Sequence, residues 1–163
     1  EMKKTLLALA LLSNSWVAPA QQFEMAYSEM NSQGPGQVCA GARNSSGNST
    51  TIYQNVNSNL AATNQTGYVS SSVIRQSGSE NTALVNQRGN GNNADISQSG
   101  SDNFAYISQT SGGDASITQQ KFGNTAYILQ KGRSVTEIRQ NGTNQSSGVV
   151  QNSSGMAIRV TQH

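Results

Sequence analysis

The sequence predicts an all-β protein, a β-solenoid of stacked strand-turn-strand rungs with two facing parallel sheets and an amyloid-like core. Two observations predict it. The unit Asn-x-Ala-x-φ-x-Gln, in which φ is mostly an aliphatic β-branched residue, recurs about every eleven residues from Asn48 onward. Short polar links, most of them with a glycine, separate the units. Two units make a rung, so the repeat of the solenoid is about 22 residues.

The unit is clearest in residues 87–109. Asn92, Ala94, Ile96 and Gln98 stand at alternate positions, and the same order of residue types returns eleven residues later. Alternate residues of an extended chain share one face, so each unit places these four side chains on the same side of a strand. β-branched residues at alternate positions favour strands. Each unit is therefore expected to form one strand with a single buried face.

The φ position supplies the predicted core. It is aliphatic and β-branched throughout, apart from Thr63, and Ile52 takes it in the first unit. The residues expected in the core are Ile74, Val85, Ile96, Ile107, Ile117, Ile128, Ile138, Val149 and Val160. Glycines two places after the glutamine, at positions 78, 89, 100, 132 and 142, are expected in tight turns because glycine reaches positive φ at little cost.

The glutamine of the unit is present every time, and it decides between two strand arrangements. A β-meander would pair antiparallel neighbours and set glutamine against asparagine. In a solenoid each glutamine stacks on an identical residue one rung away, where its amide both donates and accepts. The predicted glutamine ladder is Gln54, Gln65, Gln76, Gln87, Gln98, Gln109, Gln119, Gln130, Gln140, Gln151 and Gln162. A matching asparagine ladder is expected from Asn59, Asn81, Asn92, Asn103 and Asn124.

Composition excludes several classes of function. The chain is 34% hydrophobic and 11% charged, and its net charge of +2 comes from scattered residues, so no nucleic-acid footprint is visible. The acidic residues do not cluster as a solenoid enzyme would require. Cys39 is the only cysteine and His163 the only histidine, so neither an internal disulfide nor a Cys-His nucleophile is expected. We expect no catalytic residue, no metal or cofactor and no small-molecule substrate.

The N-terminal region has the pattern of a secretion signal. Lys3 and Lys4 precede an apolar run over residues 6–12, and Ala18-Pro19-Ala20 is typical of a cleavage site. We expect a signal peptide over 1–20, a flexible export or leader segment over 21–44 and the solenoid over 45–163. The protein is therefore expected outside the cytoplasm.

The two ends of such a solenoid are its reactive surfaces. No capping helix is readable in the sequence, and the alternating pattern continues to Gln162. An uncapped end leaves backbone N–H and C=O groups free to pair with another strand of matching side-chain order. The pattern thus indicates self-association.

The tandem pattern Gln-x-Gly-x-x-Asn-x-Ala-x-φ-x-Gln, clear over 76–87, 87–98 and 98–109, resembles the curlin repeat of bacterial curli fibres. Residues 123–132 and 156–162 are more similar to the minor curlin subunits than to the major ones. The resemblance implies a surface-held nucleator on which the major curlin subunit polymerises, exported through the curli outer-membrane secretion pore and tethered by a surface accessory factor. It also implies an extracellular place in the fimbrium at the outer-membrane surface, and roles in biofilm and adhesion.

The last rung departs from the repeat, because Gln145 and Met156 stand at the asparagine position. One hypothesis is that Met156, Ile158 and Arg159 contact the tether. The alternative is drift, since terminal repeats are commonly atypical. Two other functions stay open at this point: a major fibre subunit and a monomeric surface adhesin.

Overall fold

The computed structural model describes residues 38–40, 47–56 and 58–163. The predicted signal peptide over 1–20 and nearly all of the predicted leader over 21–44 lie outside the described residues. One short strand, β1 (Val38–Ala40), falls within the leader range and pairs in parallel with β3. No helix of the described residues is long and apolar enough to cross a membrane.

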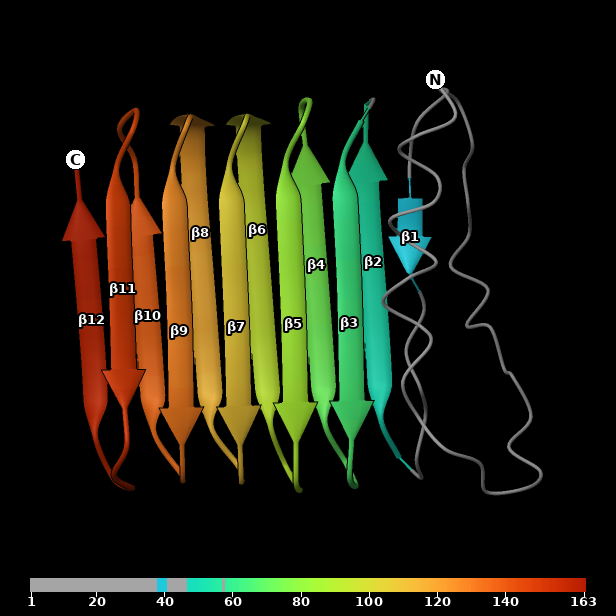
Figure 1. Ribbon diagram of the computed structural model, residues 1–163, viewed down its shortest axis with the longest axis vertical. Helices are drawn as coiled ribbons and strands as arrows, with labels where there is room; N and C mark the ends of the chain where they lie inside the picture. Colours follow the sequence, from blue (N-terminus) through green and yellow to red (C-terminus); the bar gives the residue numbers. More distant parts are fainter. Residues whose placement is uncertain (1–37, 41–46, 57) are drawn as a thin grey trace.

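The described strands form two six-stranded sheets (Figure 1). The odd sheet holds β1 and β3, β5, β7, β9 and β11, which span Leu60–Thr66, Thr82–Arg88, Phe104–Thr110, Thr125–Lys131 and Ser146–Gln151. The even sheet holds β2, β4, β6, β8, β10 and β12, which span Ser49–Asn55, Ser71–Ser77, Asn93–Ser101, Asp114–Phe122, Val135–Gln140 and Ala157–Gln162.

Every neighbouring pair of strands is parallel, and each strand pairs with the strand two places along the chain. Glutamine lies opposite glutamine, as in the pairs Gln54–Gln76 and Gln65–Gln87. The predicted solenoid with two parallel sheets is confirmed, and the β-meander is excluded. Where a link is one residue shorter, as between β7 and β8, the register still aligns Gln98 with Gln119.

The core is a thin layer between the two sheets. Alternate residues of each inner strand are buried, and Ile74, Ile96, Ile107, Ile117, Ile128 and Ile138 have no exposed surface. Val85 and Val149 are also buried. Val160, which was expected in the core, is only partly buried, as is Ile52 in the first strand of the even sheet. Both lie in the outermost strands of that sheet, where no further strand of the described residues pairs with them.

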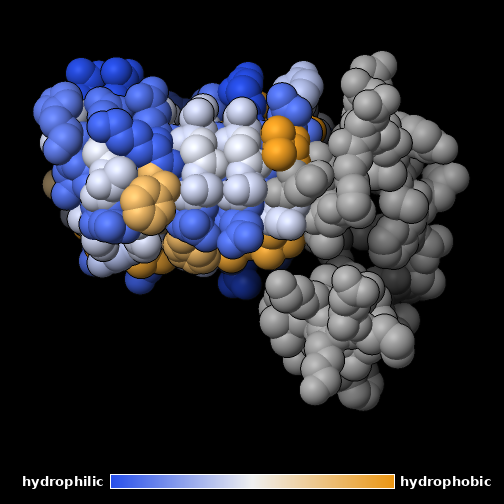
Figure 2. All heavy atoms as spheres, turned by 90° about the horizontal axis from the view of Figure 1, so that it is seen from above, coloured by the Kyte–Doolittle hydropathy of each residue, from blue (hydrophilic) through white to orange (hydrophobic). Residues whose placement is uncertain are grey.

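The links turn where glycine was expected, with one exception. Gly78, Gly89, Gly100 and Gly132 all have positive φ. Gly142 does not, so that prediction is wrong; in this link the positive φ falls on Asn144, at 54°. Figure 2 looks onto one row of these links and shows mainly hydrophilic residues.

Stacking makes some link glycines irreplaceable for a second reason. A Cβ on Gly100 would lie 1.8 Å from the carbonyl oxygen of Lys121 in the next rung. A Cβ on Gly91 would meet nothing within 4 Å, although φ there is also positive, at 69°. Rung-to-rung backbone approach, and not φ alone, therefore demands glycine at position 100.

These two glycines form a matched pair for mutation. Gly91→Ala should lower the free energy of unfolding by about 1 kcal/mol, the cost of left-handed φ for an L-residue. Gly100→Ala adds a backbone clash and should cost about 2–4 kcal/mol. Guanidinium unfolding of the soluble monomer, followed by circular dichroism, measures both. Equal losses would show that the close approach at Gly100 is unimportant.

Candidate functional site: amide ladders and open sheet ends

The glutamines form two continuous hydrogen-bonded ladders, one in each sheet. In every step the Nε2 of one glutamine donates to the Oε1 of the glutamine one rung further along, at 2.7–3.0 Å. The even ladder comprises Gln54, Gln76, Gln98, Gln119, Gln140 and Gln162, and the odd ladder Gln65, Gln87, Gln109, Gln130 and Gln151.

A second hydrogen bond made by the inner glutamine amides sets the direction of the ladders. The Nε2 of Gln65 also donates to the backbone oxygen of Ser49 in the facing sheet, at 3.1 Å, and that of Gln87 to Ser71, at 3.0 Å. Only an amide nitrogen can donate to a carbonyl, so these bonds establish which end of the side chain is nitrogen. In both ladders the nitrogens therefore point toward the C-terminal end of the solenoid.

The asparagines act differently from the stacked ladder that their spacing predicted. Asn59 Oδ1 accepts from the backbone N–H of Asn81 in the next rung, and Asn59 Nδ2 donates to the oxygen of the link residue Gly78. Among the described residues one pair of asparagine side chains is hydrogen-bonded, with Asn103 Nδ2 donating to Asn81 Oδ1 at 3.0 Å. Asn92 and Asn124 likewise bind backbone groups of the links. Asparagine thus fastens each link to the next rung.

Two threonines that sequence reasoning missed join the odd ladder across the core. Thr136 Oγ1 accepts from Gln130 Nε2 and donates to Gln151 Oε1, both at 2.6 Å. At the other end, Thr50 Oγ1 donates to Gln65 Oε1 at 3.0 Å. Both threonines replace the alanine of the unit, and this departure from the pattern is the signal that could have found them.

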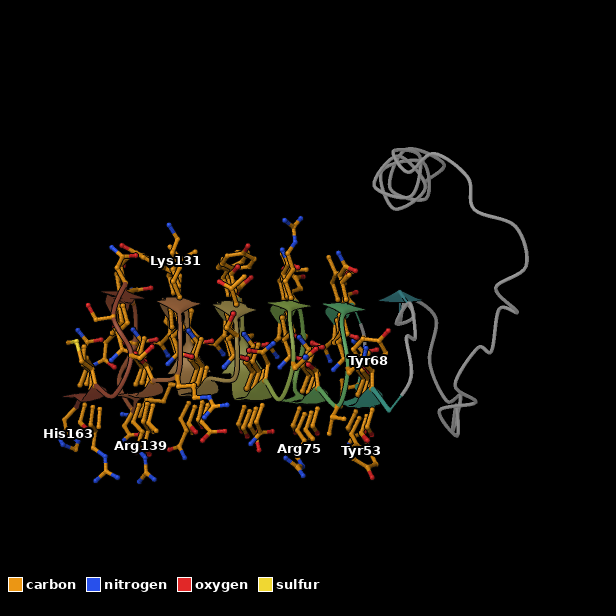
Figure 3. The ribbon with its side chains drawn as sticks, turned by 90° about the horizontal axis from the view of Figure 1, so that it is seen from below. Tyr53, Tyr68, Arg75, Lys131, Arg139 and His163 are labelled. Carbon is orange, nitrogen blue, oxygen red and sulfur yellow. The ribbon has the colours of Figure 1, made fainter. Side chains whose placement is uncertain are left out.

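The outer faces of the two sheets differ in charge. The even sheet presents charged residues: Arg75 pairs with Asp95 at 3.4 Å and lies over the ring of Tyr53, 6.0 Å from its centroid. In Figure 3, Tyr53, Arg75 and Arg139 point away from this sheet. The odd sheet instead aligns Leu84, Tyr106 and Tyr127 in one row. Sorting the repeats alternately into two sets would have shown this difference in the sequence.

Glu137 on β10 forms an ion pair with β12, the last strand of the even sheet. Its carboxylate accepts from Arg139 on its own strand and from Arg159 Nε on β12, the latter at 2.7 Å. Burial raises the pKa of Glu137, but hydrogen bonds and charge from the two arginines outweigh it and hold the pKa below its ordinary value. Arg159, predicted as a tether contact, is thus already engaged within the chain.

The C-terminal end of the solenoid exposes two strand edges. β11 is the last strand of the odd sheet, and β12 is the last strand of the even sheet. Of the other two predicted tether residues, Met156 is 45% exposed and Ile158 packs partly against the core. At the N-terminal end the outermost strands are β1 and β2. No group of three His, Cys, Asp or Glu side chains that could hold a metal gathers in the described ranges.

Comparison with known proteins finds a family model that matches part of the chain. Residues 78–110, which span β5 to β7, match the curlin associated repeat. The match shows a curlin repeat in this part of the chain. Curlin repeats belong to structural amyloid subunits and not to an enzyme family, and they imply self-association into fibres. No curated protein and no solved structure matches the chain.

The glutamine ladder can be tested in the middle of the odd sheet. Gln87→Leu leaves Gln65 Nε2 short of an acceptor and Gln109 Oε1 without its donor. Each unsatisfied buried group costs about 1–3 kcal/mol, so unfolding free energy should fall by roughly 2–5 kcal/mol. The control Asn86→Leu alters the outward neighbour on the same strand and should change stability by less than about 1 kcal/mol. Similar losses in the two variants would contradict a ladder role.

The Glu137 pairing predicts a pH dependence with a definite sign. Because the folded pKa lies below the ordinary value of 4.5, the pairing stabilises the protein fully above that value. This contribution is lost as pH falls through the folded pKa. Wild type should therefore exceed Glu137→Gln in stability at pH 7, and the difference should shrink at pH 3. Urea unfolding at the two pH values measures this, and a difference that persists at pH 3 would refute it.

Proposed function

We propose that this chain is a minor curli subunit that nucleates polymerisation of the major curlin subunit into extracellular amyloid fibres. The curlin repeat and the solenoid support a curli subunit in general. The nucleating role is the proposal. It works by templating, because a ladder end offers an incoming strand backbone groups and amides in the register that the strand needs.

One observation carries the proposal: at the C-terminal end both sheets end in strands that no further described strand pairs with, while the inner rungs keep an unbroken register. β12 pairs with β10 over Val135–Gln140 with Gln162 opposite Gln140, so the last strand still follows the pattern of the inner rungs. Folding the end strands back or covering them with a helix would block such growth. In the described part of the chain no helix covers either edge.

The remaining parts of the proposal concern the cell surface. We assign the predicted leader to export through the curli secretion pore, which places the protein outside the outer membrane. A surface accessory factor then holds it there. The half-exposed Met156, with Ile158 and Arg159 beside it, is the surface that we assign to this factor. Because Arg159 is paired with Glu137, the contact would be mainly apolar.

Seeding tests the nucleating role. The mature chain, added at about 2 mole per cent to freshly purified monomer of a major curlin, should shorten the lag phase of thioflavin fluorescence severalfold, because an ordered end removes the cost of the first rung. Preformed fibres of the major curlin serve as the positive control, and heat-unfolded mature chain serves as the negative control.

The same assay separates the rival functions. An unchanged lag, together with ready polymerisation of this chain alone, would point to a major fibre subunit. Stable monomers that neither seed nor polymerise would point to a surface adhesin.

A further inference from the structure

We propose that the C-terminal end is the receptor for the incoming strand, and that Gln151 on the open edge of β11 selects a strand with an acceptor at its glutamine position. The inference rests on the proposed templating function and adds which end templates and what it recognises. The two ends differ chemically because both ladders point their amide nitrogens toward the C-terminal end.

Gln151 is the unfinished member of the odd ladder. Its side chain is 1% exposed, and its Oε1 accepts from Gln130 Nε2 at 3.0 Å and from Thr136 Oγ1. Its Nε2 is buried and has no hydrogen-bond partner. Each inner glutamine donates to the next rung, as Gln109 does to Gln130. A buried amide donor without an acceptor costs free energy, and the missing acceptor belongs to a strand that would pair with β11.

The place for that strand is already formed. β12, the last strand of the even sheet, lies half a rung beyond β11, the last strand of the odd sheet. The end of the solenoid therefore forms a step, in which no described strand occupies the position next to β11 and facing β12. On β11, Val149 and Ser147 face into the interior and are 6% and 8% exposed. Ile158 and Val160 on β12 are partly buried against the core. A strand on β11 would therefore cover an apolar surface that two sheets already shape.

The step specifies the side chains of the occupant. In the register of the inner strands, the incoming strand would place a small residue opposite Ser147, a β-branched residue opposite Val149 and a glutamine opposite Gln151. A parallel strand with glutamine there presents its Oε1 to Gln151 Nε2, as every inner rung does. Among the described residues the odd ladder begins at Gln65, whose Nε2 already donates to Gln87 and whose Oε1 accepts from Thr50, so it offers no equivalent unpaired donor at the N-terminal end.

The chain's own N-terminal strand is a poor occupant. Val38 in β1 aligns with Leu60, and Gln65 follows Leu60 by five residues. In the sequence, Arg43 follows Val38 by five residues. An arginine side chain has no acceptor atom. The occupant is therefore a regular curlin-repeat strand of a partner subunit, and not the N-terminal segment of a second copy of this chain.

Peptide binding to the full mature chain tests the inference. The probe is a fluorescently labelled peptide of residues 102–110, which contains the regular repeat strand β7 (Phe104–Thr110) with its glutamine at Gln109. Fluorescence anisotropy is read against increasing concentrations of the chain. The same peptide with Gln109→Leu, and a peptide of residues 36–46, should each bind at least about tenfold more weakly, since neither has an amide acceptor at the glutamine position of the repeat.

Two variants of the chain locate the site. Gln151→Glu replaces the amide donor with an oxygen and keeps the oxygen that Gln130 and Thr136 contact, so it should also weaken binding of the 102–110 peptide at least about tenfold. Val150→Glu adds the same charge to the adjacent, outward-facing position of β11, which is 56% exposed, and should leave binding within about twofold. Circular dichroism verifies that both variants fold.

The outcomes separate this inference from the proposed function. Equal binding by wild type and Gln151→Glu, equal binding of all three peptides, or no binding of any peptide would overturn the inference. If the chain still shortens the lag of major curlin in any of these cases, templating stands and the receptor lies elsewhere. If binding follows the predicted order but seeding fails, the strand receptor stands and the nucleating function is wrong.

Discussion

The glutamine-to-glutamine hydrogen bond between rungs is the constraint on which the rest of this structure depends. A primary amide buried between two sheets must both donate and accept, or it costs free energy. In both ladders this hydrogen-bonding requirement is met because an identical amide lies directly above and below each inner glutamine, on the neighbouring parallel strands. Parallel pairing, unshifted register and two strands per rung all satisfy that one requirement, and they bring the isoleucines into one continuous layer.

The same requirement explains where variation is tolerated. Losing one residue from a link leaves the pairs Gln98–Gln119 and Gln119–Gln140 aligned, because the link absorbs the change. Within strands, replacement of the core alanine by Thr50 or Thr136 introduces a hydroxyl that the ladder itself satisfies. Asparagine secures the links by binding backbone groups, so its position can be exchanged for Ser70 or Ser134, which also bond across rungs. The glutamine position has no such substitute in this chain.

A ladder of oriented amides also gives the solenoid a direction. Each inner glutamine of the odd ladder bonds to a glutamine on both sides, so within that ladder the buried donor without a partner lies at the C-terminal end, on Gln151. The half-rung step between β11 and β12 places that donor beside an apolar surface. The outer faces are arranged separately, with ion pairs on the even sheet and a Leu-Tyr-Tyr row on the odd sheet. Assembly along the axis and contact through the sides therefore depend on different residues.

Sequence alone determined the strands, the buried face of each strand and the parallel stacking. Alternation of residue types with a period of two indicates which face of a strand is buried, and a glutamine that recurs in every unit finds both a donor and an acceptor when it stacks on an identical residue. It also located the turns, apart from Gly142. Only the tertiary structure decided the features that arise from contacts between residues of different rungs. These are the backbone bonds of the asparagines, the threonine bridges, the capture of Arg159 by Glu137, the opposite character of the two outer faces and the unpaired amide of Gln151. Each depends on the direction in which a side chain points once the rungs are stacked, which a linear pattern of residue types does not encode.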